Sequence, residues 1–303
     1  MKVFITGVEG FVGKYLARHL ASSGFEVHGS YHSDKPDVEG SLCKLDILDK
    51  DALPRLLEKL QPAYIFHLAA ISSVRQSIEE PQVTRAVNVT GTKNLLDAAK
   101  LLQLDCRLLL VSSAEVYGKP QKIPITEDHP LKPLNPYAKS KLEMEKLAQE
   151  YDLDYVISRS FTHTGPGQSA NFFCSEFAKT IAEIEKGLRP AVLTYGDAEI
   201  VRDLTDVRDM VRAYQLLLDK GKGRGIYNIC SGRGVAISQV LEILTRQSSA
   251  KIALKQDKSK VAKNSIRTMV GSCEKFQQIS KWKPTVEIEQ TLQDMLSYWR
   301  LHV

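Results

Sequence analysis

Three glycines follow the first strand-like segment of the chain, each three residues after the one before. Residues 2–6 are apolar enough for a buried β-strand, and apolar side chains recur at helical spacing over 11–23. Gly7, Gly10 and Gly13 therefore occupy the turn between a strand and a helix. Glycine there allows a tight turn, close approach of the backbone to a pyrophosphate, and close packing of helix on sheet. The helix start also offers unpaired N–H groups to a phosphate. The pattern predicts a dinucleotide-binding loop.

The first half of the chain alternates apolar strands with helical patterns. This alternation is typical of a parallel sheet with helices on both faces, and it predicts an α/β fold with a Rossmann-type doubly wound sheet. The expected strands are 2–6, 26–31, 64–68, 107–112 and 155–159, and the expected helices are 11–23, 49–60, 83–103 and 136–151.

The second half is less regular and predicts a smaller substrate domain that is intergrown with the first. We expect a dinucleotide-binding domain at 1–162, joined by about 200–232, and a substrate-binding cap at 163–199 and about 233–303. The cap would cover the carboxyl ends of the strands, where α/β proteins bind ligands. The expected elements here are helices near 172–186, 207–219, 237–247, 273–279 and 287–301, and a strand at 226–229.

Composition narrows the class of protein. The 303 residues suffice for one large domain or two intergrown ones. A net charge of +5 without a dense basic stripe suits a small anionic substrate and does not indicate nucleic-acid binding. No apolar run approaches the ~20 residues of a membrane span, and no secretory leader is visible. The five cysteines are scattered and lack metal-ligand spacing, so we expect a cytoplasmic protein with reduced thiols, no metal and no membrane partner.

Tyr137 and Lys141 lie four residues apart at the start of a predicted helix, directly after Pro136. Side chains at i and i+4 share one face of a helix. An ammonium group near a phenol favours the phenolate, so we expect Lys141 to lower the pKa of Tyr137 from its reference of about 10. Tyr137 would then be a usable proton donor or acceptor. Ser113 follows a central strand, at the end where a reacting carbonyl group would lie.

Several motifs occur together in the first half: Gly7-x-x-Gly10-x-x-Gly13, His67-Leu68-Ala69-Ala70, Asn88-Val89-x-Gly91-Thr92, Ser112-Ser113 and Tyr137-x-x-x-Lys141. The second half contains Arg159-Ser-Phe-Thr-His163-Thr-Gly165-Pro-Gly-Gln168, Val201-Arg202-Asp-Leu-Thr-Asp206-Val-Arg-Asp209 and Ile226-Tyr-Asn228-Ile-Cys-Ser231-Gly-Arg233-Gly234. The first set resembles the extended short-chain dehydrogenases/reductases. The second set resembles one branch of them, the GDP-4-keto-6-deoxy-D-mannose reductases, which make GDP-D-rhamnose. The likeness covers nearly the whole chain.

This resemblance implies a role for each matching residue. Tyr137 would protonate the alkoxide forming at sugar C4, Lys141 would tune Tyr137 and bind the nicotinamide ribose, and Ser113 would hydrogen-bond the carbonyl oxygen. The implied cofactor-binding residues are Gly7, Gly10, Phe11, Val12, Gly13, Asp46, Ile47, Leu68, Ala69, Ala70, Tyr137, Lys141 and His163. The implied substrate-binding residues are Ser113, Glu115, Thr162, Arg202, Lys263 and Arg267.

The substrate positions fit the family pattern unevenly. Arg202 suits the nucleotide diphosphate, because a guanidinium pairs bidentately with phosphate oxygens. Thr162 stands where the family has asparagine, and the family's Arg-Pro pair is missing, with Lys263 or Arg267 as substitutes. The nucleotide base and the hexose therefore stay open.

The end of the second predicted strand bears on the choice between NADP and NAD. An acid near Ser30 or Tyr31 would bind the ribose 2′-hydroxyl in an NAD enzyme, and neither residue is acidic. Ser30, His32 and Lys35 could accept a 2′-phosphate. The sequence therefore favours NADP and leaves NAD open.

Other functions are compatible with these motifs. Glu115 stands two residues after the catalytic hydroxyl, where a nucleotide-sugar 4,6-dehydratase places the base that removes the C5 proton. A 4-epimerase shares the fold, and a non-catalytic nicotinamide-sensing protein would use it without needing a tuned Tyr137. The helices at 83–103 and 136–151 keep apolar side chains on faces that the sheet does not need. Relatives pair through such helices, so we expect a homodimer that binds a nucleotide sugar.

Overall fold

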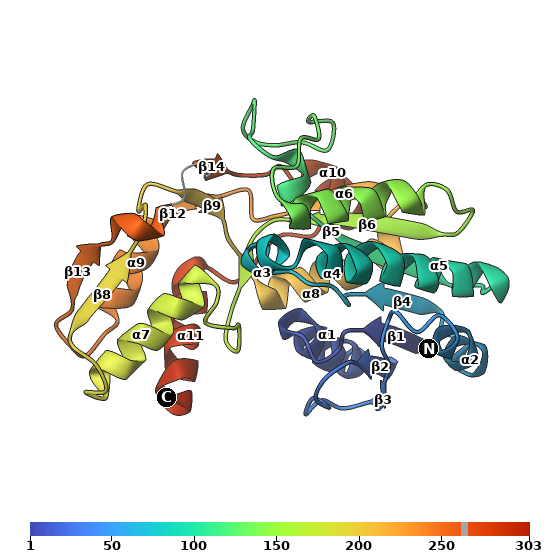
Figure 1. Cartoon of the computed structure of the whole chain (residues 1–303), viewed down its shortest axis with the longest axis horizontal. Coiled ribbons are helices and arrows are strands. Elements are labelled where there is room, and N and C mark those ends of the chain that lie inside the picture. The colour runs from blue at the N-terminus through green and yellow to red at the C-terminus, as the bar shows by residue number, and fades with distance from the viewer. Residues whose placement is uncertain (262–265) are drawn as a thin grey trace.

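The computed structural model describes residues 1–261 and 266–303. At its centre lies a seven-stranded sheet in the order β11-β6-β5-β4-β1-β2-β3, and every neighbouring pair in it is parallel (Figure 1). The chain runs outward in opposite directions from β1 and from β4, so the point between them is the switch point of a doubly wound sheet. The strands are β1 (Lys2–Thr6), β2 (Glu26–Tyr31), β3 (Ser41–Lys44), β4 (Tyr64–His67), β5 (Arg107–Ser113), β6 (Tyr155–Ser160) and β11 (Ile226–Ile229). The expected fold class is confirmed.

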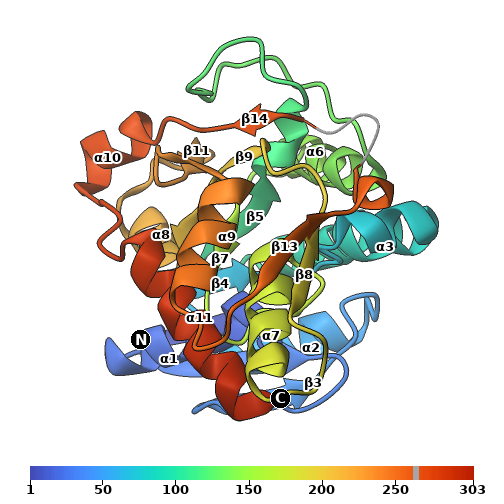
Figure 2. The ribbon, with the colours of Figure 1, turned by 90° about the vertical axis from the view of Figure 1, so that its left-hand side faces the viewer.

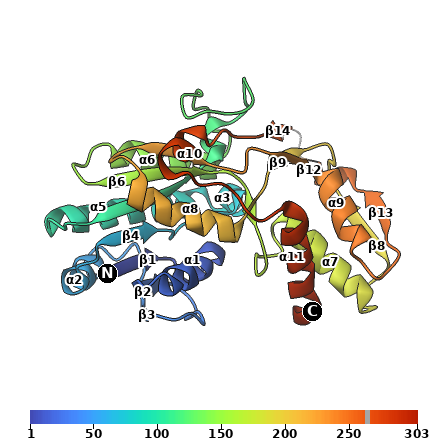
Figure 3. The same cartoon turned by 180° about the vertical axis from the view of Figure 1, so that it is seen from behind.

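Helices cover both faces of this sheet and bury a separate apolar cluster on each. Figure 3 shows α1 and α8 from the side on which they lie. The first face carries α1 (Phe11–Ser22), α8 (Val207–Lys220) and α10 (Glu274–Ser280), and the second carries α2 (Ala52–Leu60), α5 (Gly91–Leu101) and α6 (Pro136–Ala148).

Helix α10 comes from the last part of the chain but completes the core of the sheet. The ring of Phe276 packs edge-on against Tyr227 of β11, with 6.2 Å between ring centroids, and lies 5.8 Å from Trp282. The indole N–H of Trp282 donates to the carbonyl oxygen of Asp209 in α8 at 3.2 Å. The first face of the sheet is thus closed by residues far away in sequence.

A third apolar cluster lies beside the sheet and joins three helices to a two-stranded parallel sheet (Figure 2). We call this group the outer lobe. Its elements are α7 (Phe173–Glu185), β8 (Val192–Tyr195), α9 (Ile237–Arg246), β13 (Ala253–Gln256) and α11 (Ile288–His302).

Short strands connect the outer lobe to the sheet. β7 (His163–Thr164) pairs in parallel with β10 (Thr205–Asp206). β9 (Val201–Asp203) pairs antiparallel with β12 (Gly234–Ala236) and parallel with β14 (Thr268–Met269). The remaining short elements are α3 (Val74–Glu79), α4 (Pro81–Arg85), a π-helical segment (Ala86–Thr90) and 3₁₀ turns at Ala114–Tyr117 and Lys258–Lys260.

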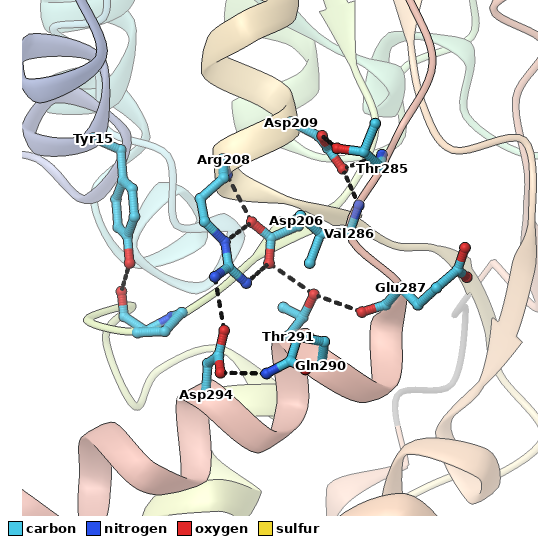
Figure 4. A network of polar contacts seen from close by, with 11 residues as sticks. Tyr15, Asp206, Arg208, Asp209, Thr285, Val286, Glu287, Gln290, Thr291 and Asp294 are labelled. Carbon is cyan, nitrogen blue, oxygen red and sulfur yellow. Dashed lines mark hydrogen bonds and ion pairs between the residues drawn. The ribbon is translucent and has the colours of Figure 1, made fainter. Parts of the chain in front are cut away.

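A polar network around the buried Asp206 carboxylate holds α11 against the start of α8 (Figure 4). The Asp206 side chain caps α8 by accepting the Arg208 backbone N–H at 2.7 Å, and it also accepts the Arg208 guanidinium and the Thr291 hydroxyl. The same guanidinium pairs with Asp294 of α11 at 2.7 Å. A separate contact joins α1 to the loop before α7: the Tyr15 hydroxyl donates to the Pro166 carbonyl at 2.9 Å.

The structure refines several expected elements. The single helix expected at 83–103 is instead α4, the π-helical segment and α5, because one extra residue enters the turn around Asn88. The strand β3 and the helix α3 had no counterpart among the expected elements. Within the described ranges, none of the helices is both long and apolar enough to cross a bilayer.

Candidate active site

A cavity of about 390 Å³ opens at the carboxyl ends of the central strands, between the sheet and the start of α7. It brings together most of the residues that the sequence predicted, from both halves of the chain. The predicted residues that line it are Gly7, Gly10, Phe11, Val12, Gly13, Leu68, Ala70, Ser113, Glu115, Tyr137, Lys141, Thr162, His163 and Arg202.

The glycine loop forms one wall of the cavity and has no space for side chains. Gly7 has a φ of +70°, and a Cβ there would lie 2.9 Å from the Cα of Ala69. A Cβ on Gly13 would lie 2.5 Å from the Gly7 carbonyl oxygen. Gly10 is the N-cap residue of α1 and has no side chain to cap it, so the first-turn N–H groups are available to an anion.

Buried hydrogen bonds fix the loop to the sheet from below. The Thr6 hydroxyl accepts the backbone N–H groups of Leu68 and Ala69, each at 3.1 Å, and bonds to Nδ1 of His67 at 2.8 Å. Nε2 of His67 bonds to the Thr92 hydroxyl at 2.9 Å. Burial lowers the pKa of His67 to about 3, so this imidazole is neutral and acts as a structural link.

Ser113 and Glu115 stand at the end of β5, on the opposite side of the cavity. The Ser113 hydroxyl caps the following 3₁₀ turn by accepting the Glu115 N–H at 3.2 Å. The Glu115 carboxylate accepts the side-chain amide of Asn135 at 3.1 Å. Asn135 in turn caps α6 by accepting the Ala138 N–H at 2.8 Å. These contacts hold the β5 end and the Tyr137 helix in one arrangement.

Tyr137 and Lys141 enter the cavity from the first turns of α6. Pro136 occupies the first helical turn after the Asn135 cap, which suits its fixed φ. The Tyr137 backbone N–H donates to the Ser77 hydroxyl of α3 at 3.1 Å. The Lys141 ammonium is buried and donates to the Val111 carbonyl of β5 at 2.7 Å.

The expected lowering of the Tyr137 pKa is not observed. Burial raises the pKa of Tyr137 to about 12; interaction with the Ser113 side chain opposes the rise and the Glu115 charge adds to it. The Lys141 ammonium does not offset this rise: it bonds to the Val111 carbonyl, and burial lowers its own pKa to about 8. The phenol is therefore protonated at neutral pH, which is the form that a proton donor needs.

A buried ion pair supports this helix from behind. Glu145, one turn after Lys141, pairs with Arg159 of β6 at 2.7 Å, and both side chains are almost fully buried. The Arg159 guanidinium also donates to the Tyr117 hydroxyl at 3.2 Å. The Glu145–Arg159 pair therefore joins α6 to β6. Removal of either residue would leave an unpaired buried charge, which is strongly destabilising.

Arg202 reaches the cavity from β9. Its guanidinium donates to the carbonyl oxygens of Val201 at 2.9 Å and of Arg267 at 3.4 Å, and burial lowers its pKa. The carboxylates next to it in sequence bind elsewhere: Asp203 accepts the Ser231 and Gly232 N–H groups, and Asp206 binds Arg208. Among the carboxylates, Glu115 is the one whose charge raises the pKa of Arg202, and both side chains line the cavity.

Thr162 and His163 follow β6 and line the same cavity. The Thr162 carbonyl accepts the Thr205 N–H at 3.0 Å. Nδ1 of His163 lies 3.0 Å from the Phe161 carbonyl oxygen, and burial lowers the pKa of His163.

Some predicted residues lie outside the cavity lining. Ile47 is buried against Gly91, and Ala69 contributes its backbone behind Gly7. Asp46 is exposed beside the β3 end, and Arg267 touches Arg202 through its carbonyl group while its side chain is exposed. Lys263 lies outside the described residues.

Other lining residues had not been predicted. Most of them lie at or next to the end of a helix or strand, while Gln168 lies in a loop and Tyr214 lies within α8: Ser72, Val74, Ser160, Gln168, Phe172, Phe173, Tyr214 and Met269. The aromatic pair Phe172-Phe173 was the one available signal, because it begins the helix predicted near 172–186. A smaller hollow of about 250 Å³ lies further along α7, lined by Glu176, Lys179, Glu183, Arg189 and Lys260 among others. Among residues 1–261 and 266–303, no cluster of His, Cys, Asp and Glu could hold a metal ion.

A glycine cradle and a Tyr–Lys pair at one cavity of a doubly wound sheet define the short-chain dehydrogenases/reductases, which use nicotinamide cofactors. Within that class, the chain belongs to the family described as GDP-mannose 4,6 dehydratase, whose sequence model matches residues 4–295.

Individual relatives include both reductases and dehydratases. GDP-6-deoxy-D-mannose reductase of Pseudomonas aeruginosa is 33% identical over 100% of this chain and 98% of its own length. Human GDP-mannose 4,6 dehydratase is 26% identical over 96% of this chain and 89% of its own length.

Solved structures agree with the fold. RMD from Pseudomonas aeruginosa complexed with NADPH has a TM-score of 0.88 at 32% identity and covers 100% of this chain and 99% of its own. UDP-glucose 4-epimerase from Thermus thermophilus in complex with NAD has a TM-score of 0.88 at 27% identity and covers 100% of both chains.

Proposed function

We propose that this protein uses NAD(P)H to reduce the C4 ketone of GDP-4-keto-6-deoxy-D-mannose, which gives GDP-D-rhamnose. The observation that carries the proposal is the convergence of Ser113, Tyr137 and Lys141 on one cavity with the glycine loop. The 33% identity to a GDP-6-deoxy-D-mannose reductase supports the same substrate class.

The residues of the loop fit a dinucleotide. Gly7 and Gly13 leave a cradle that a Cβ would fill, and the start of α1 offers N–H groups to the pyrophosphate. Leu68 and Ala70 would flank the cofactor, and Lys141 would bind the nicotinamide ribose. When bound, the reduced nicotinamide supplies the hydride for the ketone carbon.

The protein's own residues would handle the proton and the developing charge. Tyr137 donates its phenolic proton to the ketone oxygen as the C4–H bond forms, and it regains a proton from solvent afterwards. Ser113 donates a hydrogen bond to the same oxygen, a fixed contact typically worth a few kcal/mol in the transition state. Phe172 and Phe173 line the cavity and would limit the access of water.

On the substrate side, Arg202 would bind the diphosphate, and Thr162 and Glu115 would contact the sugar. Lys263 and Arg267 remain candidates for a second phosphate contact.

A 4,6-dehydratase is the second candidate, because Glu115 lines the cavity two residues after Ser113. Its contact with Asn135 favours a positioning role, since it ties the carboxylate to the α6 cap.

Cofactor stoichiometry tests the proposal. Purified protein should oxidise one mole of NAD(P)H for each mole of GDP-4-keto-6-deoxy-D-mannose converted to GDP-D-rhamnose. A dehydratase or epimerase would turn over its substrate without net oxidation, and a nicotinamide-sensing protein would bind cofactor without turnover. Parallel assays with the dTDP-linked 4-keto sugar would test the base.

We also propose a homodimer built from helices at 83–103 and 136–151. Ile78, Val83 and Leu101 expose 62%, 48% and 72% of their surface on or beside these helices, which supports an apolar contact. Light scattering should give the mass of a dimer, and a monomer at micromolar concentration would argue against it.

The domain division and the location of the protein belong to the proposal as well. The division at 1–162 with about 200–232, against 163–199 with about 233–303, is supported by the separate core of the outer lobe. Residues 273–282 pack with the sheet core instead. The five free cysteines suit a cytoplasmic protein.

A further inference from the structure

Glu9, inside the glycine loop, places a carboxylate at the carboxyl end of β2. The Val8 N–H donates to the Ser30 carbonyl at 2.9 Å, which fixes the loop to this strand. Oε1 of Glu9 accepts the backbone N–H of His32 at 2.7 Å. Because β2 ends at Tyr31, the carboxylate lies where an acid of the strand itself would otherwise stand.

The second carboxylate oxygen of Glu9 has no structural role. Oε2 is shielded from solvent and lacks a hydrogen-bond partner within the described part of the chain. Native structures rarely leave such an atom unpaired, because its desolvation is costly. One oxygen suffices for the contact with His32, and the Glu9 side chain as a whole is only half-buried. Oε1, which already accepts the His32 N–H, can accept a hydroxyl donor as well, because a carboxylate oxygen has more than one lone-pair site.

At the end of β2, the side chains that could bind a 2′-phosphate are poorly placed to do so. Ser30 is only 3% exposed, so its hydroxyl belongs to the sheet interior. The His32 imidazole points toward another carboxylate, with 3.9 Å between its Nε2 and Oδ2 of Asp46. Lys35 is exposed, and a lysine is a flexible point charge rather than a planar fork for phosphate.

We infer that Glu9 binds the adenosine ribose and makes this protein select NADH over NADPH. In Rossmann enzymes an acid near the end of the second strand accepts the ribose 2′-hydroxyl, and the same charge repels a 2′-phosphate. Here the glycine loop supplies that acid. The inference rests on the proposed cofactor site and reverses the preference that the β2 end alone suggested. It also distinguishes this chain from the Pseudomonas reductase, whose complex contains NADPH.

Titration calorimetry without sugar substrate tests the inference. NADH should bind the wild-type protein at least about tenfold more tightly than NADPH. ADP should likewise bind more tightly than 2′-deoxy-ADP, which tests the ribose contact without any variant. Glu9→Gln retains an acceptor for the His32 N–H and removes the charge. This variant should bind NADH about tenfold more weakly than the wild type does, and its affinities for NADH and NADPH should be nearly equal.

Asp34→Asn is the matched control, because it removes an exposed carboxylate from the loop after β2. It should change the binding of both cofactors by less than about twofold, since solvent and salt screen an exposed charge. If the wild type bound NADPH as tightly as NADH or more tightly, this inference would be overturned and the proposed function would stand. The inference would also be overturned if Glu9→Gln changed the ratio of NADH to NADPH affinity no more than Asp34→Asn does. A protein that binds neither cofactor would overturn the proposed function together with the inference.

Discussion

The seven-stranded sheet and the outer lobe reach their apolar cores by different routes. In the sheet, β1, β2 and β3 are neighbours, and so are β4, β5 and β6, so most pairings join consecutive strands. The core of the outer lobe combines residues from three separate segments: 174–204, 240–244 and 292–296. Local periodicity in the sequence therefore predicts the first region well and the second poorly.

The two regions also divide the proposed work. The sheet supplies the glycine cradle, Ser113, Tyr137 and Lys141, while the short strands beside the lobe supply Arg202. If this division is correct, changes in the sheet should act on chemistry and folding, and changes at the lobe boundary should act on substrate affinity.

Tyr137→Phe should have the largest effect. Loss of the only proposed proton donor should lower kcat about 10³-fold, with little change in the affinity for cofactor. Steady-state kinetics and cofactor titration measure the two quantities. Tyr151→Phe is the control, since the Tyr151 hydroxyl bonds to Asp97 at 2.6 Å, outside the cavity lining. Retained activity in Tyr137→Phe would refute the mechanism.

Asp206→Ala should come next, because it removes a buried acceptor that joins α8 to α11 (Figure 4). We expect a loss of about 3 kcal/mol in the free energy of unfolding. The KM for sugar nucleotide should rise more than the Kd for cofactor. Asp294→Ala removes the other carboxylate on Arg208, which is 28% exposed, and should cost less than about 1 kcal/mol. Equal losses in the two variants would contradict the assigned role of burial.

The loss of folding stability at acidic pH should depend on His67. The pKa of His67 in the folded chain is about 3, below its ordinary value of 6.5, so the unfolded chain binds a proton that the folded chain excludes. Stability should therefore fall as pH decreases from 6.5 toward 3, by about 2 kcal/mol at pH 5. His67→Asn should be less stable at pH 8 but show a shallower acid slope in urea unfolding. The exposed His302→Gln should keep the wild-type slope, and an unchanged slope in His67→Asn would contradict the prediction.

Arg202→Lys should give the smallest of these effects. Replacing a planar fork by a point charge should raise the KM for the sugar nucleotide about tenfold and leave kcat nearly unchanged. Arg233→Lys changes an exposed guanidinium that pairs with Glu287, so it serves as the control. An equal KM in the two variants would remove Arg202 from the proposed diphosphate site.

The elements that the sequence predicted correctly have strong local signals. β1, β2 and β11 begin and end where expected, because turn residues bound them: Gly7 follows β1, Gly24 precedes β2 and Gly225 precedes β11. β3 and the two- or three-residue strands were missed, since so few residues show no period. Their pairing depends on partners far away, as in β9 with β14.

Local sequence also predicts the site only in part, because contacts between distant segments leave no local pattern. The spacing of Tyr137 and Lys141 placed both side chains in one cavity, but it could not reveal that the ammonium bonds to the Val111 carbonyl. That contact comes from the approach of β5 to α6. No local pattern singles out Glu9, because its hydrogen bond to His32 forms only when the loop meets β2.

The late position of α10 has a consequence for how the protein is made. Phe276 and Trp282 cover the sheet beside β11 and α8, so a nascent chain emerging from the ribosome keeps that surface bare until synthesis is almost complete. The nucleotide-binding portion, although first to be translated, is thereby among the last to close. A chain that stops short of α10 should consequently engage chaperones or aggregate, even with every cofactor-binding residue already present.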